Sequence, residues 1–280
     1  MEKREGSPPT SRRECATFGL ISHPAPVSSA PQQVTSCMLW YMAPIHRRPD
    51  TLTVGVLLAA VGGFLDAYTF VRHQVFANLQ SGNVLLFCVE ATARHWHRAL
   101  LLLAPIAAFS VGVLVVQVLG LPRVQRLVHR PLRLMLTLQI ALLSALATLP
   151  AGMPEQMTTV TVSFVAALQF STFTTLRDSP YTTLAESGNL HKAIVAAHQW
   201  CMGKEPAAAR RAGRYTAVVA AFVAGAVTGA LLTRVAGTPA IATAAGLLAA
   251  VLVTLIRQTR QLERGTTDTR PPTPPPAATR

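Results

Sequence analysis

Apolar residues run in long blocks along most of this chain, separated by short polar or basic stretches. Six blocks reach about 20 residues, which is the length a helix needs to cross a bilayer. Two shorter blocks, at about 82–94 and 188–201, fall below that length, so we expect half-helices that do not cross. The six full spans are predicted at 51–71, 99–121, 132–150, 157–176, 213–233 and 238–257.

The composition agrees with this pattern. Half of the residues are hydrophobic and only 13% are charged, whereas a soluble chain usually has about 25% charged residues. Blocks such as 54–60 and 99–108 have no polar face, which each helix of a soluble bundle would need. The sequence therefore predicts an all-α polytopic membrane protein whose partner is the lipid bilayer.

The tripeptide Ser-Gly-Asn occurs twice, at 81–83 and at 187–189. Each copy follows an apolar block that carries one strongly polar residue. That residue is Asp66 before the first copy and Gln169 before the second. Each copy also stands at the beginning of one of the two short blocks, so the pattern indicates a duplicated membrane unit.

A third matched position extends the duplication. A Phe-x-x-Gly begins at Phe109 and again at Phe222, and the three matched pairs are separated by 103, 106 and 113 residues. A separation that grows along the chain is expected if the second copy has gained loop residues. We therefore predict two membrane repeats, at 51–150 and 157–258.

The two ends of the chain differ in composition from the repeats. Residues 1–50 are rich in Ser, Pro, Arg and Thr, and we expect a disordered basic tail there. The proline-rich end, 259–280, is expected to be a second disordered tail. Met42 is an alternative to Met1 as the true start.

Basic residues predict the orientation, because Lys and Arg favour the cytoplasmic side. Stretches 122–131 and 177–214 and both termini are basic, whereas 151–156 carries one acid and no base. These signals agree only if neither half-helix crosses. Each repeat then has three spans, so the second is inverted relative to the first and both termini are cytoplasmic. The bases that this orientation places outside are Arg72, Arg94 and Arg98.

Asp66 is the one carboxylate inside a predicted full span. A charged residue at the bilayer centre costs about 2.5–3.5 kcal/mol, so such a residue usually faces a cavity or a partner. One interpretation is a proton or cation site, or a gate; the other is a structural Asp that caps or binds a neighbouring helix. Its repeat partner, Gln169, is typical of hydrogen bonding between helices.

The Ser-Gly-Asn elements suit the start of a helix. Serine is a good N-cap, glycine allows sharp bends and close approach, and half-helices with inward N-termini form substrate sites in transporters with inverted repeats. The alternative is capping and packing alone. Gly225 and Gly229 form a GxxxG, which predicts close helix packing. The candidate substrate or coupling-ion residues are Asp66, Ser81, Gly82, Asn83, Gln169, Ser187, Gly188 and Asn189.

Other classes of function have little support in the sequence. We find no nucleophile–base set, phosphate loop or metal-ligand spacing, so we expect no enzymatic activity, cofactor or metal. The four cysteines also lack metal or disulfide spacing. The net charge of +13 lies in loops and tails rather than on a folded basic face, so no nucleic-acid partner is expected.

The stretch Gly63-Phe64-Leu65-Asp66-Ala67, followed by Ser81-Gly82-Asn83, resembles the YoaK-like family of bacterial inner-membrane proteins of unknown function. Its members commonly show Gly-x-x-Asp-Ala and then Thr-Gly-Asn, and serine here keeps the hydroxyl group. Phe170 replaces the Asn that follows Gln in the family's second half. The resemblance covers about residues 50–258 and implies a multi-pass protein of the bacterial inner membrane, but no activity.

The inverted duplication and its single intramembrane carboxylate favour a small secondary transporter or permease for an unidentified small solute. The alternative is a non-transporting membrane scaffold or ligand-sensing module, in which the duplicated polar groups only hold helices together. The sequence leaves assembly into homo-oligomers open.

Overall fold

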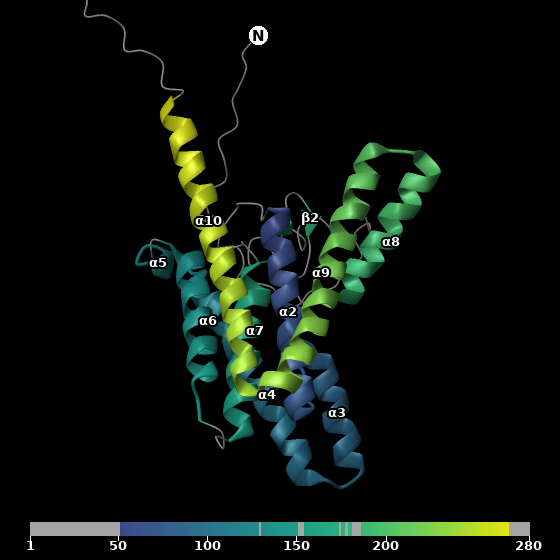
Figure 1. Ribbon diagram of the computed structural model, residues 1–280, viewed down its shortest axis with the longest axis vertical. Coiled ribbons are helices and arrows are strands. Elements are labelled where there is room, and N and C mark those ends of the chain that lie inside the picture. The colour runs from purple at the N-terminus through teal and green to yellow at the C-terminus, as the bar shows by residue number, and fades with distance from the viewer. Residues whose placement is uncertain are drawn as a thin grey trace, which may run out of the picture. The chain divides into compact units, whose positions relative to one another are not determined.

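Long apolar helices make up most of the described chain (Figure 1). The computed structural model describes residues 51–128, 130–150, 154–173, 175–176, 179–180 and 186–268. The predicted N-terminal tail, 1–50, and the last twelve residues lie outside this part. The helices are α2 Leu52–His73, α3 Gln80–Thr92, α4 Trp96–Leu119, α5 Pro122–Gln125, α6 Pro131–Ala147, α7 Glu155–Thr172, α8 Glu186–Gly203, α9 Pro206–Ala236, the 3-10 helix η2 Thr238–Ile241, and α10 Ala242–Asp268.

Four helical stretches are long and apolar enough to cross a bilayer. They are α2, α4, α9 and the stretch Thr238–Gln261, which joins η2 to most of α10. Helix α6 is apolar but has only 17 residues, and the 18 residues of α7 include several Thr, Ser and Gln. Helix α10 also continues to Asp268, past the point at which the C-terminal tail was predicted to begin.

Large apolar side chains project outward from these long helices. On α4, Leu100 and Leu114 are 61% and 62% exposed, and on α9 Leu231 is 57% exposed. Extended apolar surface of this kind marks contact with a membrane or a partner. The main buried core lies between α2, α6, α7 and α10 and includes Phe64, Tyr68, Leu143, Val162 and Leu248.

Helices stand at both positions predicted for half-helices, at opposite ends of the described bundle (Figure 1). Helix α3 has 13 residues, about 20 Å at 1.5 Å per residue. Helix α8 has 18 residues, so it is longer than the predicted block 188–201. A two-residue antiparallel strand pair, β1 Thr175–Leu176 with β2 Ser179–Pro180, lies between α7 and α8.

The helices pack in pairs that join the two halves of the chain. Helix α2 packs along α9, α4 along α7, and α6 against α10. Each half-helix packs on the long helix that follows it, α3 on α4 and α8 on α9. Helix α10 also contacts α2, α6 contacts α7, and α2 contacts α7.

Glycines allow the closest of these contacts. A Cβ added at Gly229 would lie 2.7 Å from the carbonyl oxygen of Phe64, and one at Gly225 would collide with the carbonyl of Ala60. Both glycines of the GxxxG therefore lie directly against the backbone of α2. The packing is the one that such a motif favours, with small residues letting two helix backbones approach.

Candidate functional site

The loop between α2 and α3 turns back along α2 instead of leaving the bundle. The backbone N–H of Asn78 donates to Asp66 Oδ1 at 2.8 Å, and Asn78 Nδ2 donates to the carbonyl oxygen of Gly62, also at 2.8 Å. Gly62 is eleven residues before the end of α2, which is about 16 Å along the helix. Helix α3 therefore begins deep in the bundle and runs outward.

Asn83 closes this returning loop. Its Oδ1 accepts from the backbone N–H of Phe76 at 2.9 Å, and its Nδ2 donates to the carbonyl oxygen of Phe76 at 2.7 Å and to Gln80 Oε1 at 2.9 Å. The side chain is fully buried. One asparagine thus satisfies both backbone groups of Phe76, which would otherwise lack partners inside the bundle.

Gly82 and Ser81 have different relations to this loop. A Cβ on Gly82 would lie 2.8 Å from the ring of Phe76, so this glycine leaves room for an aromatic side chain rather than for another backbone. Ser81 is exposed, and the N-cap of α3 is Leu79, with no side-chain capping bond. The predicted capping role of Ser81 is therefore wrong, because Asp66 and Asn83 supply the side-chain acceptors at this end of the helix.

The second Ser-Gly-Asn differs in the same way. Ser187 is exposed and already helical, because α8 begins at Glu186, so it is not an N-cap either. A Cβ on Gly188 would meet nothing within 4 Å. Asn189 is fully buried and donates to Glu186 Oε1 at 3.4 Å. Burial raises the pKa of the Glu186 carboxyl to about 7, and the hydrogen bond from Asn189 opposes that rise.

Gln169 joins the two halves of the chain. It is fully buried on α7, and its Nε2 donates to the carbonyl oxygen of Leu58 on α2 at 2.8 Å. The predicted residues consequently fall into three places: the returning loop at Asp66, the start of α8, and this link between helices. The structure does not gather all eight around one centre, and their part in solute binding stays a prediction.

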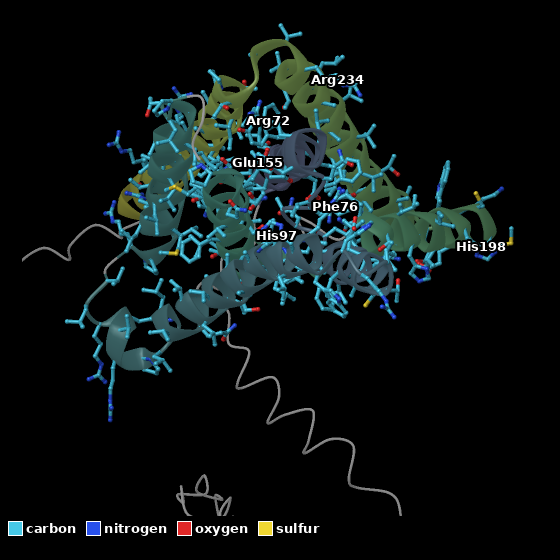
Figure 2. All side chains as sticks on the ribbon, turned by 90° about the horizontal axis from the view of Figure 1, so that it is seen from below. Arg72, Phe76, His97, Glu155, His198 and Arg234 are labelled. Atoms are coloured by element: carbon cyan, nitrogen blue, oxygen red, sulfur yellow. The ribbon has the colours of Figure 1, made fainter. Side chains whose placement is uncertain are left out.

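A cavity of about 500 Å³ opens at the α3 end of the bundle. The end of α2, helix α3 and the first turns of α4 and α7 line it, and we call it the vestibule. Figure 2 views this end and labels three of its polar residues, Arg72, His97 and Glu155. The charged and imidazole side chains that line it are Arg72, His73, Glu90, His97, Arg98 and Glu155.

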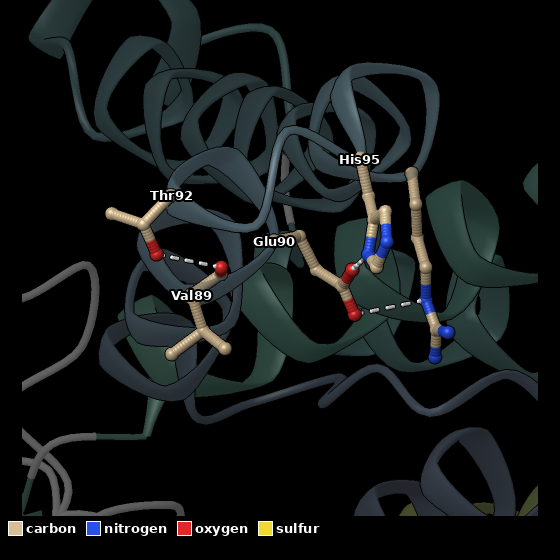
Figure 3. A network of polar contacts seen from close by, with 5 residues as sticks. Val89, Glu90, Thr92 and His95 are labelled. Atoms are coloured by element: carbon tan, nitrogen blue, oxygen red, sulfur yellow. Dashed lines mark hydrogen bonds and ion pairs between the residues drawn. The ribbon is translucent and has the colours of Figure 1, made fainter.

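Glu90 fastens the outer end of α3 to the start of α4 (Figure 3). Its Oε2 lies 2.9 Å from His95 Nδ1, and its Oε1 accepts from Arg98 Nε at 3.2 Å. The Glu90 side chain is only 17% exposed, so this pair is screened less than a surface ion pair. The carboxylate of Glu90 and the guanidinium of Arg98 are therefore already paired in the absence of a ligand.

His73 occupies a more unusual position in the wall of the vestibule. Its side chain is 5% exposed, and Nδ1 lies 3.6 Å from Glu155 Oε2, beyond the range of a hydrogen bond. Among the described residues, neither ring nitrogen has a hydrogen-bond partner. Buried polar groups are nearly always paired, so the two unpartnered ring nitrogens make His73 an exception in this wall.

Sequence reasoning did not assemble the vestibule, although two signals pointed to its surroundings. Arg72 and Arg98 were exceptions to the predicted orientation, since basic residues are uncommon on the outer side. Asn78 is the one asparagine of the chain's three that lies outside the two Ser-Gly-Asn copies. All three are buried, and Asn78 and Asn83 hold the returning loop.

Four long apolar helices with outward apolar side chains indicate a helical membrane protein. It belongs to the family described as protein of unknown function (DUF1275), which matches residues 54–254. That range contains the returning loop, the vestibule and both half-helices. Neither the curated proteins nor the solved structures contain a match to this chain.

Proposed function

We propose that the chain is a small secondary transporter or permease of six spans, built as two inverted repeats of three spans and one half-helix. The helix contacts support the repeat. Exchanging α2 with α7, α3 with α8, α4 with α9, and α6 with α10 leaves the set of contacts between these helices unchanged. A duplicated unit folded on a two-fold axis accounts for that symmetry.

Matched glycine contacts support the same arrangement. Gly225 on α9 lies against the backbone of α2, and its repeat partner Gly112 on α4 lies against α7, where an added Cβ would be 2.9 Å from the carbonyl oxygen of Phe164. Inversion is supported by Figure 1, in which α2 and α7 run in opposite directions and α3 and α8 lie at opposite ends.

The two remaining spans would be α6 and α7. Seventeen residues of α6 extend about 26 Å, near the lower limit for a crossing helix. Helix α7 is largely enclosed, with Val162, Val165 and Leu168 fully buried. A helix surrounded by other helices needs less apolar surface toward lipid, which accounts for its Thr and Ser content.

The orientation follows from the basic residues. In Figure 1 the start of α2, helix α5 and the end of α10 lie toward the α8 end, and the connections there carry most of the Arg and Lys residues. We therefore place both termini and α8 on the cytoplasmic side of a bacterial inner membrane, with the vestibule outside.

The observation that carries the transport proposal is the continuity between the vestibule and the returning loop. Gln74 and Val75, the first residues of the loop, line the vestibule, and Asn78, near its end, binds Asp66 deep in the bundle. A solute that displaces Gln74 and Val75 would therefore strain the hydrogen bond between Asn78 and Asp66. The inward N-terminus of α3 also places the positive end of a helix dipole there, as in the half-helices of transporters.

Flux through proteoliposomes tests this proposal. Purified protein would be reconstituted and supplied with a panel of radiolabelled amino acids, carboxylates, amines and sugars under imposed proton and sodium gradients. We expect gradient-dependent uptake of at least one class, reduced in Asp66→Asn. Uptake that Asp66→Asn leaves untouched would remove Asp66 from the mechanism, and no uptake at all would contradict transport.

The scaffold or sensor alternative is favoured by a specific observation. The hydrogen bonds of Asp66, Asn83 and Gln169 go to the protein's own groups, chiefly to backbone N–H and C=O groups. If Asp66→Asn unfolds the protein in detergent, the result supports a structural role for the Asp66 carboxylate. If the Asp66→Asn variant stays folded and loses flux, the result supports a role for Asp66 in transport.

A further inference from the structure

The vestibule has a distribution of charge that indicates what it binds. Glu90 and Arg98 neutralise each other at 3.2 Å. Arg72 is exposed, and among the described residues no acidic side chain lies within ion-pair distance of it. Glu155 is 74% exposed and approaches only His73. One cation and one anion that line the cavity therefore remain for a ligand.

A ligand with a single charge fits this wall poorly. A simple anion would gain Arg72 but meet the Glu155 carboxylate, and a simple cation would gain Glu155 but meet the Arg72 guanidinium. In either case a charge of the same sign would lie next to the ligand, which opposes binding. A zwitterion presents each end to its opposite and leaves no ligand charge unpaired.

His73 supplies the third polar contact. It follows Arg72 at the end of α2, its side chain is 5% exposed, and it lines the vestibule beside Glu155. An imidazole ring with two nitrogens can donate through one and accept through the other. It therefore suits either the carboxylate or the ammonium of a ligand held between Arg72 and Glu155.

Apolar side chains make up another part of the lining. Phe70, Leu86, Leu101 and Leu102 line the same cavity, and Leu102 is 5% exposed. A volume of about 500 Å³ lies within the range of small-molecule sites. The ligand should consequently have a hydrocarbon body next to its paired charges.

We propose that the vestibule binds a neutral α-amino acid with an apolar side chain, its carboxylate at Arg72, its ammonium at Glu155 and its side chain against the apolar wall. This assignment deepens the proposed function, on which its meaning as a transport substrate rests; binding itself does not require transport. It also accounts for a base on the outer side of the membrane, since Arg72 would bind a ligand there rather than set the orientation.

Binding of tritiated leucine to the full chain in lipid nanodiscs tests the assignment. Two competitors keep the hydrocarbon body and one charge each: 4-methylpentanoate keeps the carboxylate, and isoamylamine keeps the ammonium. We expect saturable leucine binding, with each competitor at least about tenfold weaker, because each lacks one hydrogen bond to a charged group.

Paired variants make the test specific. Arg72→Gln should weaken leucine at least about tenfold and leave isoamylamine unchanged, whereas Glu155→Gln should weaken leucine and leave 4-methylpentanoate unchanged or tighter. His73→Gln should weaken leucine without reversing this preference. Arg234→Gln, at an exposed position that does not line the cavity, is the matched control and should bind normally.

The contrary outcomes are distinct. No saturable leucine binding would overturn the assignment, as would a competitor that binds as tightly as leucine, because the site would then take a simple anion or cation. Equal loss in Arg234→Gln would do the same. Leucine binding without flux would contradict the transport proposal alone, and flux of another solute without leucine binding would contradict this assignment alone.

Discussion

Asn83→Ala is the substitution whose effect follows most directly from the structure. The buried Asn83 side chain pairs with both backbone groups of Phe76, and alanine would leave an N–H and a C=O without partners. Each buried group left unpaired costs about 1–3 kcal/mol, so the free energy of unfolding should fall by about 2–6 kcal/mol. The returning loop and the start of α3 should be affected first.

Ser81 provides the matched control, because it lies two residues away on the same helix and is exposed. The variants would be purified in detergent and heated to a series of temperatures. Size-exclusion chromatography of the heated samples would then measure the thermal stability of each variant. Ser81→Ala should change stability by less than about 0.5 kcal/mol. If Ser81→Ala were as destabilising as Asn83→Ala, the serine would be a cap after all and our interpretation of the loop would be wrong.

Three further predictions concern helix packing at Gly225, the role of Asp66 in uptake, and the dependence of stability on pH. Gly225→Ala should destabilise the protein by about 1–3 kcal/mol, since the new methyl group collides with the Ala60 carbonyl, whereas Gly246→Ala, which meets nothing within 4 Å, should be neutral or stabilising in the same thermal assay. Asp66→Asn keeps an oxygen for the Asn78 N–H, so it should remain folded by that assay while losing uptake; unfolding would assign Asp66 a structural role. Because the pKa of Glu186 is raised to about 7 by burial, its neutral form favours the folded state, and stability should fall as pH rises from about 4.5 through 7. Melting curves at several pH values should show a smaller fall in Glu186→Gln, and equal slopes would contradict this role.

Four of the six predicted spans fall on helices long and apolar enough to cross a bilayer, because a long apolar block has few alternatives in a membrane. The block at 51–71 became α2, Leu52–His73, and the short block after the first Ser-Gly-Asn became the 13-residue α3. The second half-helix was predicted two residues too short at each end, since α8 runs from Glu186 to Gly203 and the predicted block covered 188–201. Periodicity and composition describe where a helix is apolar, not where its hydrogen bonding ends.

The site could not be predicted to the same extent. Serine was the natural capping residue by type, but the path of the loop decides which side chain reaches the backbone, and that path brings Asn83 to Phe76 and Asp66 to Asn78. The vestibule joins His73 to Glu155, which are far apart in the chain. No local pattern reveals such a contact. The unexplained outer arginines and the remaining asparagine, Asn78, were the sequence signs of its surroundings.

Cysteine accessibility is the most direct test of the inverted arrangement. Cys201 on α8 is exposed, and a cysteine at the exposed Thr92 would mark the outer end of α3. Each would be kept as the single cysteine, with the other cysteines replaced by serine, in sealed right-side-out vesicles treated with a membrane-impermeant thiol reagent. We predict labelling of Thr92→Cys in intact vesicles and of Cys201 only after permeabilisation. Labelling of both from the same side would contradict two inverted repeats.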